Sequence, residues 1–170
     1  MTAMRQRDSG VIRRPPGEVW PWITEPERIA RWNPKLERAG APSSGRLQVG
    51  SSWGARYRMG RRPVEVQAVV ETWDPPREFT LRYRWGADAH ALEHCLLEPV
   101  ADGTRLTRVV EIHDPRIPLP FRLLAGFLMR FGHPPGAADG ASRPGESSVD
   151  TIRRLVEGGP TGTSRRAPRS

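Results

Sequence analysis

Two charged residues, Glu93 and Arg108, have side-chain types and a spacing that could do chemistry together. They lie in two strand-like segments joined by Asp102-Gly103, a good signal for a hairpin turn. If both point to the buried side of the pair, they must associate, because an isolated buried charge is strongly disfavoured. The result is a buried ion pair or a polar clamp for a ligand oxygen. A pairing shifted by one residue instead puts both in solvent, with Leu92 and Leu96 turned inward.

Aromatic residues at alternate positions of strand-like segments form a second group of candidates. Tyrosine and tryptophan suit a binding cavity because each offers an apolar body and one hydrogen-bonding tip. The alternative is that the rings simply fill the core, as the close packing of protein interiors generally requires. The candidates for lining a cavity are Trp53, Tyr57, Phe79, Tyr83 and Trp85.

The other reactive side chains form no recognised catalytic or metal-binding pattern. His90, His94 and His113 lack a metal-site spacing. Cys95 is the only cysteine, which excludes an internal disulfide and a cysteine-based zinc site. No cationic motif or base lies beside it in the sequence, so we expect a buried, inert thiol. The chain contains no nucleophile elbow and no phosphate-binding glycine loop. We therefore expect neither a metal nor a cofactor.

These candidate residues must be positioned by strands. Apolar and polar residues that alternate with a period of two predict where those strands lie. In the segment 53–59, apolar and aromatic residues alternate with arginines, which is typical of a strand with one buried and one solvated face. The result is an antiparallel meander with one apolar face, and such a sheet needs a cover. The predicted strands are 53–59, 64–70, 79–85, 91–98 and 104–113.

Two short helices are predicted from VWPWITEPERIARWNP, residues 19–34. They span about 17–23 and 27–38. Pro26 suits the first turn of the second helix and disfavours helical geometry at the residue before it. We expect Trp20 and Trp32 to anchor these helices against the sheet.

The apolar segment 117–131 is expected to cover the sheet as a helix. Its polar positions make only one thin stripe, and a helix that is apolar around most of its circumference is normally enclosed on several sides. The apolar side chains of this helix that we expect at a ligand cavity are Phe121, Leu124, Phe127 and Leu128.

A second helical segment, 148–157, has Ser147 as a candidate cap. Between the two helical segments, residues 133–145 contain prolines and glycines and no large apolar side chain, so they interrupt the helix. This stretch is either an inserted surface loop or a hinge that admits a ligand. We expect one domain over 1–158 and a disordered basic tail over 159–170.

The formal charge of +8 on 170 residues raises the question of nucleic acid or an anionic membrane as partner. The 27 basic residues are scattered, and all except Lys35 are arginines, a bias that GC-rich codon usage can produce unaided. We therefore do not expect nucleic-acid binding. The N-terminus has no apolar run typical of a secretory signal, and the segment 117–131 is too short and too charged to span a bilayer. These features predict a cytoplasmic protein without a transmembrane segment.

Three pieces of sequence now occur in the order of a known superfamily. The first piece is a strand that ends near Ile12 and leads into Val19-Trp20, Glu25-Pro26 and Trp32-Asn33-Pro34. The second precedes an aromatic strand and reads Trp73-Asp74-Pro75-Pro76-Arg77. The third forms the last hairpin and reads LLEPVADGTRLT. Over residues 11–157 the chain resembles the helix-grip (SRPBCC, START-like) superfamily, which contains lipid carriers and polyketide cyclase/dehydrase proteins. The resemblance implies an α+β fold: a curved antiparallel sheet wrapped around a long C-terminal helix, with two short helices between strands 1 and 2. The interruption at 133–145 departs from that pattern.

The resemblance also implies a cavity between sheet and helix. Its alignment of Leu97 and Leu106 as inward residues turns Glu93 and Arg108 inward too. The first function implied is a carrier or sequestering protein for a hydrophobic small molecule, lipid or polyketide-like. The second is a cyclase/dehydrase (aromatase-like) enzyme, in which Glu93, Arg108 and the tyrosines position a poly-carbonyl chain and move protons. The third is a protein-partner module of the chaperone-activator kind.

Overall fold

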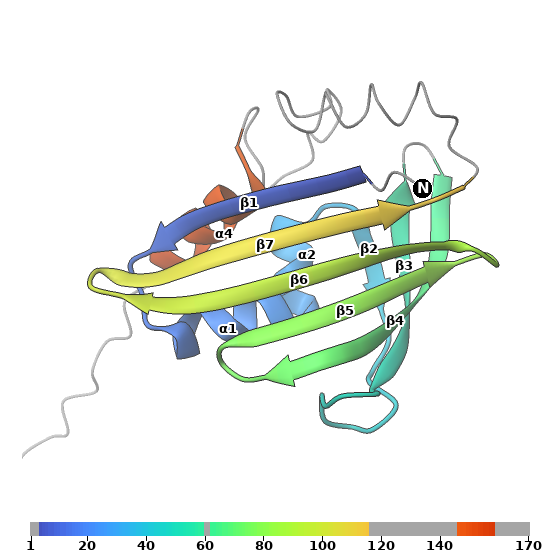
Figure 1. The fold of residues 1–170 in the computed structure, drawn as a ribbon, viewed down its shortest axis with the longest axis horizontal. Helices are drawn as coiled ribbons and strands as arrows, with labels where there is room; N and C mark the ends of the chain where they lie inside the picture. Colours follow the sequence, from blue (N-terminus) through green and yellow to red (C-terminus); the bar gives the residue numbers. More distant parts are fainter. Residues whose placement is uncertain (1–3, 60–61, 116–145, 159–170) are drawn as a thin grey trace, which may run out of the picture.

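The computed structural model describes residues 4–59, 62–115 and 146–158 of the chain. Within them, the strands form one antiparallel sheet, and the helices lie together on one of its faces (Figure 1). The elements are β1 (Met4–Ile12), α1 (Pro16–Thr24), α2 (Pro26–Trp32), β2 (Leu36–Ala39), β3 (Ser52–Met59), β4 (Arg62–Asp74), β5 (Glu78–Trp85), β6 (Ala89–Val100), β7 (Gly103–His113) and α4 (Ser148–Glu157).

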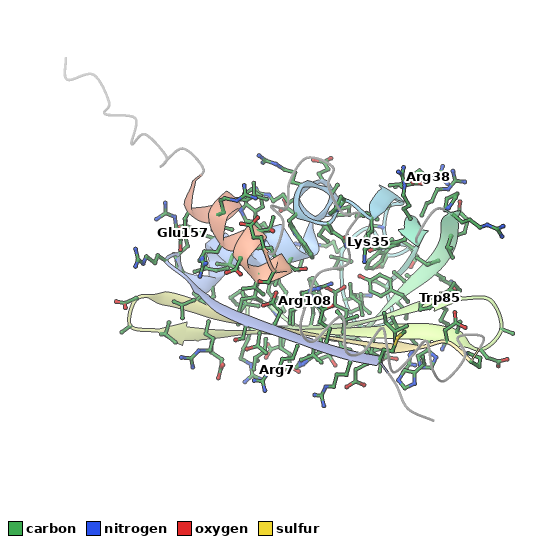
Figure 2. The ribbon with its side chains drawn as sticks, turned by 90° about the horizontal axis from the view of Figure 1, so that it is seen from above. Arg7, Lys35, Arg38, Trp85, Arg108 and Glu157 are labelled. Atoms are coloured by element: carbon green, nitrogen blue, oxygen red, sulfur yellow. The ribbon has the colours of Figure 1, made fainter. Side chains whose placement is uncertain are left out.

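The sheet has the strand order β1-β7-β6-β5-β4-β3-β2, so the first two strands of the chain form its two edges. The strands from β2 to β7 pair with their neighbours in sequence, as the predicted meander requires, and β1 pairs antiparallel with β7. The sheet curls, and α1, α2 and α4 cover its concave side (Figures 1 and 2). This is the α+β helix-grip architecture, with two short helices between the first two strands and a helix at the C-terminal side.

Proline sets the boundaries of the two short helices. Pro26 lies in the first turn of α2, and Glu25 before it is extended, with φ −88° and ψ 121°. Helix α2 ends at Trp32 because Asn33-Pro34 follows, and the residue before a proline disfavours helical geometry. The prediction of a helix over 27–38 was therefore wrong at its C-terminal half, where β2 forms instead and pairs with β3.

A tight turn joins β6 to β7, and the predicted Asp102-Gly103 hairpin is confirmed. Val100 pairs with Gly103 across the turn. Gly103 has a φ of 139°, and a Cβ atom at this position would clash with the Ile12 carbonyl oxygen. Only glycine fits there, because it tolerates this backbone geometry and leaves room for the end of β1.

The register of this hairpin decides which side chains face the helices. Leu97 pairs with Leu106, and their side chains are buried, with 1% and 0% of their surface exposed. Alternate residues of a strand share one face, so Glu93 and Arg108 point to the same concave side as these leucines. Of the two registers that the sequence left open, the inward one is observed.

Helix α4 packs closely on β1. Its predicted cap is confirmed, because the Ser147 hydroxyl oxygen accepts a hydrogen bond from the Asp150 backbone N–H. The Asp8 carboxylate of β1 accepts another from the Val149 backbone N–H at 2.8 Å. A Cβ atom at Gly10 would lie 3.1 Å from Val149 Cγ1, so the strand needs a small residue where the helix crosses it.

Tryptophans hold the two short helices against the rest of the core. The Trp20 ring centroid lies 5.1 Å from that of Trp73 and 5.6 Å from that of Phe79, both on the sheet. The buried Trp32 ring donates a hydrogen bond from Nε1 to the Trp22 carbonyl oxygen at 2.7 Å. Trp20 and Trp32 therefore anchor the helices, as expected.

The predicted helix over 117–131 lies outside the described residues, as do the stretch 133–145 and the tail 159–170. The covering helix, the loop or hinge and the disordered tail therefore stay predictions, together with the single-domain boundary at residue 158.

Candidate functional site

An ion pair between Glu93 and Arg108 lies on the concave face of the sheet. Arg108 Nε donates to Glu93 Oε1 at 2.5 Å, and the two side chains are only 12% and 11% exposed. The residues are diagonal neighbours, since Arg108 pairs with Cys95 and Glu93 with Val110. Burial alone lowers the pKa of Arg108, but the Glu93 carboxylate outweighs it and raises this pKa above its ordinary value. The buried charge is therefore paired, as the sequence argument required.

The two tyrosines of the chain extend this polar group toward β3. The Tyr83 hydroxyl donates to Glu93 Oε2 at 2.9 Å. The Tyr57 ring meets the Tyr83 ring edge-on, with 5.6 Å between their centroids. Burial, followed by the nearby Glu93 charge, raises the pKa of Tyr57 to about 12 and the pKa of Tyr83 well above its ordinary value. Both hydroxyls are therefore protonated donors at neutral pH.

Arg108 also connects the sheet to two helices. Its guanidinium carbon lies 5.3 Å from the centroid of the Trp32 ring at the end of α2, a cation–π contact. Its Nη1 lies 3.5 Å from the Ser148 hydroxyl oxygen at the start of α4, a long hydrogen bond. Figure 2 shows Arg108 on the side of the sheet that the helices cover, whereas Arg7 lies on the opposite side.

Lys35 is a further cation on this side of the sheet (Figure 2). It stands between α2 and β2, and its carbonyl oxygen accepts a hydrogen bond from the Arg58 backbone N–H at 2.7 Å. Burial of the ammonium group, followed by the Arg108 charge, lowers the pKa of Lys35. The side chain nevertheless keeps accessible surface.

A pocket opens between the short helices and strands β2 to β5. Its walls are largely apolar, and the Tyr57 and Tyr83 rings form part of them. The cavity volume is about 20 Å³, which is room for about one water molecule. The lining residues are Ile23, Thr24, Pro26, Ile29, Leu36, Ala39, Leu47, Trp53, Tyr57, Trp73, Phe79, Leu81 and Tyr83.

The structure brings only part of the predicted site to this pocket. Trp53, Tyr57, Phe79 and Tyr83 line it. Trp85 is buried in a separate cluster with Ala89 and Ala91, and its Nε1 donates to Asp114 at 3.3 Å. Glu93 and Arg108 lie next to the tyrosines rather than in the pocket wall. The helix candidates Phe121, Leu124, Phe127 and Leu128 lie outside the described residues.

Sequence reasoning missed several residues of the pocket and its surroundings. Ile23 and Ile29 were noticed for their helical spacing, but nothing in that spacing distinguishes a pocket wall from a packed core. Leu36 was assigned to a helix, so its position beside Tyr57 could not be foreseen. Lys35 carried one signal, namely that it is the only lysine among 27 basic residues.

The histidines and the cysteine form no second reactive site in the described part of the chain. The rings of His90 and His113 stack at 4.7 Å, but no group of three potential metal ligands occurs among the described residues. Cys95 is 1% exposed, and burial, followed by the Glu93 charge, raises the pKa of its thiol well above the ordinary value. A protonated, buried thiol is a poor nucleophile, in agreement with the sequence analysis.

A curled sheet with helices on its concave side and a few polar groups in an apolar interior defines a helix-grip domain. The sequence profile of the family described as "Polyketide cyclase / dehydrase and lipid transport" matches residues 5–132. The chain belongs to this family, whose fold supports a domain that binds hydrophobic ligands. No curated protein matches the chain. Among the described residues, no helix has the length and apolar character needed to cross a bilayer.

Solved structures agree with this fold at low sequence identity. Protein CV1439 from Chromobacterium violaceum is similar with a TM-score of 0.58 and 17% identity, over 90% of this chain and 97% of its own. Protein NE0264 from Nitrosomonas europaea gives a TM-score of 0.61 at 14% identity, over 91% and 95% of the two chains. Protein MLL2253 from Mesorhizobium loti gives 0.58 at 14% identity, over 91% and 98%. At such identities the likeness concerns the fold alone.

Proposed function

We propose that the chain binds a hydrophobic small molecule, lipid-like or polyketide-like, between the sheet and the helices, as a carrier or sequestering protein. The observation that carries the proposal is the pocket between α1, α2 and strands β2 to β5, because an apolar lining with two tyrosine hydroxyls nearby suits such a ligand. Burial of the ligand's apolar surface would supply most of the affinity, at about 25 cal/mol per Å² removed from water.

The small cavity volume has a consequence for how a ligand enters. With about 20 Å³ free, a molecule larger than one water fits only if the pocket walls move apart. Ile29 on α2 is half-buried, as is Leu47 in the loop between β2 and β3. Both lie outside the sheet, so the wall formed by α2 and this loop is the part expected to move.

The first experiment is native mass spectrometry of the freshly purified protein, followed by titration with N-phenyl-1-naphthylamine. This neutral probe fluoresces strongly in apolar surroundings. We expect a co-purifying small molecule or saturable binding of the probe. A protein that is empty and shows no saturable binding would overturn the proposal.

A pair of variants locates the binding. Ile29→Trp fills the pocket from α2 and should weaken probe binding by about tenfold or more. Ala30→Trp adds the same side chain at the exposed neighbouring position of α2 and should leave binding unchanged. Equal affinities for the two variants would show that the probe binds elsewhere.

A second candidate function is an enzyme of the cyclase/dehydrase type, favoured by the hydrogen-bonded group of Tyr83, Glu93 and Arg108 next to the pocket. In it, Arg108 and the tyrosine hydroxyls would hold the oxygens of a poly-carbonyl chain, and Glu93 would move a proton. Turnover of a poly-ketone chain that falls about a hundredfold or more in Glu93→Gln, with binding retained, would support it. Binding without any turnover leaves the carrier as the function.

A further inference from the structure

The two parts of the pocket wall that lie outside the sheet are held in different ways. Helix α2 is fixed through Trp32, whose buried ring donates a hydrogen bond to the Trp22 carbonyl oxygen at 2.7 Å and contacts the Arg108 guanidinium. In the loop between β2 and β3, Leu47 lines the pocket and packs against the main core cluster. The Leu47 backbone makes no hydrogen bond within the described residues, so its neighbours must hold this side chain in place.

A single buried hydroxyl group holds these neighbours. Ser51 is only 2% exposed, and its Oγ donates to the Arg46 carbonyl oxygen at 3.2 Å. The same Oγ accepts the Gln48 backbone N–H at 3.0 Å, and the Ser44 hydroxyl oxygen lies 2.6 Å from it. Both residues that flank Leu47 are therefore tied to Ser51 through their backbones.

Ser51 is in turn fixed to the sheet. Its carbonyl oxygen accepts the Val70 backbone N–H of β4, and the Val70 carbonyl oxygen accepts the Gly50 backbone N–H, both at 2.9 Å. Val70 is 1% exposed and belongs to the main core cluster. The Ser51 hydroxyl therefore stands on a rigid base, and its hydrogen bonds connect the loop to that base.

The loop segment that Ser51 holds lies between two glycines. Gly45 and Gly50 have φ values of 70° and 85°, which glycine adopts readily and other residues rarely do. A Cβ atom at either position would meet no atom within 4 Å, so backbone conformation, and not crowding, requires glycine there. On the outer side of the segment, Val49 is 61% exposed, which leaves room for an outward movement. Residues of this kind, at both ends of a segment, can absorb the dihedral changes of a hinge.

We propose that residues 46–49 form a lid over the pocket, with Leu47 as its plug and the Ser51 hydroxyl as its latch. This inference rests on the proposed binding function and states how that site opens. With the lid closed, the pocket holds about one water molecule. When the lid swings outward, Leu47 leaves the pocket wall, and the backbone groups of Arg46 and Gln48 exchange the Ser51 hydroxyl for water. Opening is therefore a small rearrangement, because water replaces most of the hydrogen bonds that are lost.

Stopped-flow mixing of the full chain with N-phenyl-1-naphthylamine tests the lid. In the parent, the observed binding rate should level off as the probe concentration rises, because opening of the lid limits it. Ser51→Ala removes the latch and should raise this limiting rate about tenfold, since the closed state loses its buried hydrogen bonds. The probe should also dissociate faster, and the amides of residues 46–49 should exchange faster with solvent.

Ser52→Ala is the matched control. It removes the same hydroxyl group from the next residue, whose backbone groups, and not its side chain, bond to Ser43. We expect the rates and the exchange of the parent. Equal acceleration in the two variants would overturn the assignment of the latch to Ser51. If thermal unfolding shows that Ser51→Ala is not folded, Ser44→Ala replaces it; this exposed residue is one member of the network, and its loss should accelerate binding by a smaller factor.

Leu47→Ala tests the plug. It should raise the limiting rate by itself, because a smaller side chain obstructs the pocket less. Adding Ser51→Ala to it should then change the rate little further, since the latch acts by holding Leu47 in place. Effects of the two substitutions that multiply would show that they act independently, and they would overturn the link between latch and plug.

The outcomes separate the lid from the proposed function. If the probe binds saturably and its observed rate rises linearly with concentration in the parent, or if Ser51→Ala binds and exchanges like the parent, the lid is overturned while the binding site remains. If the probe binds to none of these folded proteins, the proposed function itself fails.

Discussion

Glu93 and Arg108 are diagonal neighbours on β6 and β7 whose side chains meet at 2.5 Å, with little of either exposed to solvent. A pair of this kind is not in itself strong evidence of stability, because desolvation of both charges offsets their attraction. The effect of a single substitution is more informative, because removing one partner leaves the other charge buried and unpaired. The pair therefore makes the concave face sensitive to single substitutions and tolerant of double ones.

The first prediction is a double-mutant cycle on this pair. Arg108→Met should lower the free energy of unfolding by about 3 kcal/mol or more, because Glu93 is left with only the Tyr83 hydroxyl. Glu93→Leu should cost a similar amount. The double variant should lose clearly less than the sum of the two single losses. Urea unfolding measures all four proteins, and additive losses would show that the two charges are solvated independently.

The second prediction concerns alkaline pH, where Tyr57 and Tyr83 are the only tyrosines of the chain. The pKa of each is raised in the folded protein, that of Tyr57 to about 12. Above pH 10 or so, the unfolded chain therefore loses phenolic protons that the folded chain retains. The unfolded state then binds fewer protons, so stability must fall as pH rises, by about 1 kcal/mol per pH unit for each tyrosine.

Two measurements check this. Phenolate absorbance should be nearly absent in the folded protein at about pH 10.5 and appear when the protein unfolds in the same buffer. Tyr57→Phe should show a shallower loss of stability with pH than the parent, and the comparison cancels the contributions of Cys95 and Lys35. Ordinary titration of both tyrosines in the folded protein would contradict the burial of their hydroxyls.

Local signals in the sequence predicted most of the fold. The alternation in the central strands, the Asp102-Gly103 turn and the Ser147 cap each depend on a few neighbouring residues, and the structure confirms all three. Strand β2 was missed because Leu36–Ala39 has only four residues, two of them charged, and it is held by pairing with β3 rather than by its own pattern.

The candidate site was harder to predict because it depends on pairing between distant segments. The register of the last hairpin stayed open in the sequence because Leu92 and Leu96 on the outer face are also apolar, so both faces of β6 resemble a buried one. The meeting of Arg108 with the Trp32 ring has no local signal at all. It requires α2 to end at Trp32 and to lie on the face of the sheet from which Arg108 of β7 projects.

The third prediction is a direct measurement of the Lys35 pKa. Reductive methylation with isotope-labelled formaldehyde labels only Lys35 and the N-terminal amine, because the chain has no other lysine. We expect the Lys35 signal to titrate below the ordinary lysine pKa of about 10.4, because burial and the Arg108 charge disfavour its protonated form. Arg108→Met should move this pKa upward. The N-terminal amine provides an internal reference.

The sign of the linked stability effect follows from this shift. Between the folded pKa of Lys35 and its unfolded pKa, the unfolded chain binds more protons than the folded one. The contribution of Lys35 to stability therefore rises with pH through that window. A Lys35 signal that titrates at or above its ordinary value would contradict the expected effect of burial and of the Arg108 charge.

The fourth prediction concerns the contact of α4 with β1, which places Ser148 next to Arg108. Asp8 accepts the Val149 backbone N–H, one of the N-terminal donors of the helix that lack an intrahelical partner. Asp8→Ala should cost about 1 kcal/mol of stability, as the loss of a cap does. Asp88→Ala, at an exposed position between β5 and β6, should be neutral and serves as the control.

Gly10 tests the same contact by packing instead of hydrogen bonding. An added methyl group there would lie 3.1 Å from Val149 Cγ1, whereas one at Gly54 on β3 meets no atom within 4 Å. Gly10→Ala should therefore displace α4 and speed hydrogen exchange of its amides, and Gly54→Ala should not. If exchange in α4 stays unchanged in both Asp8→Ala and Gly10→Ala, the helix is held by its apolar face alone, and β1 does not position the site.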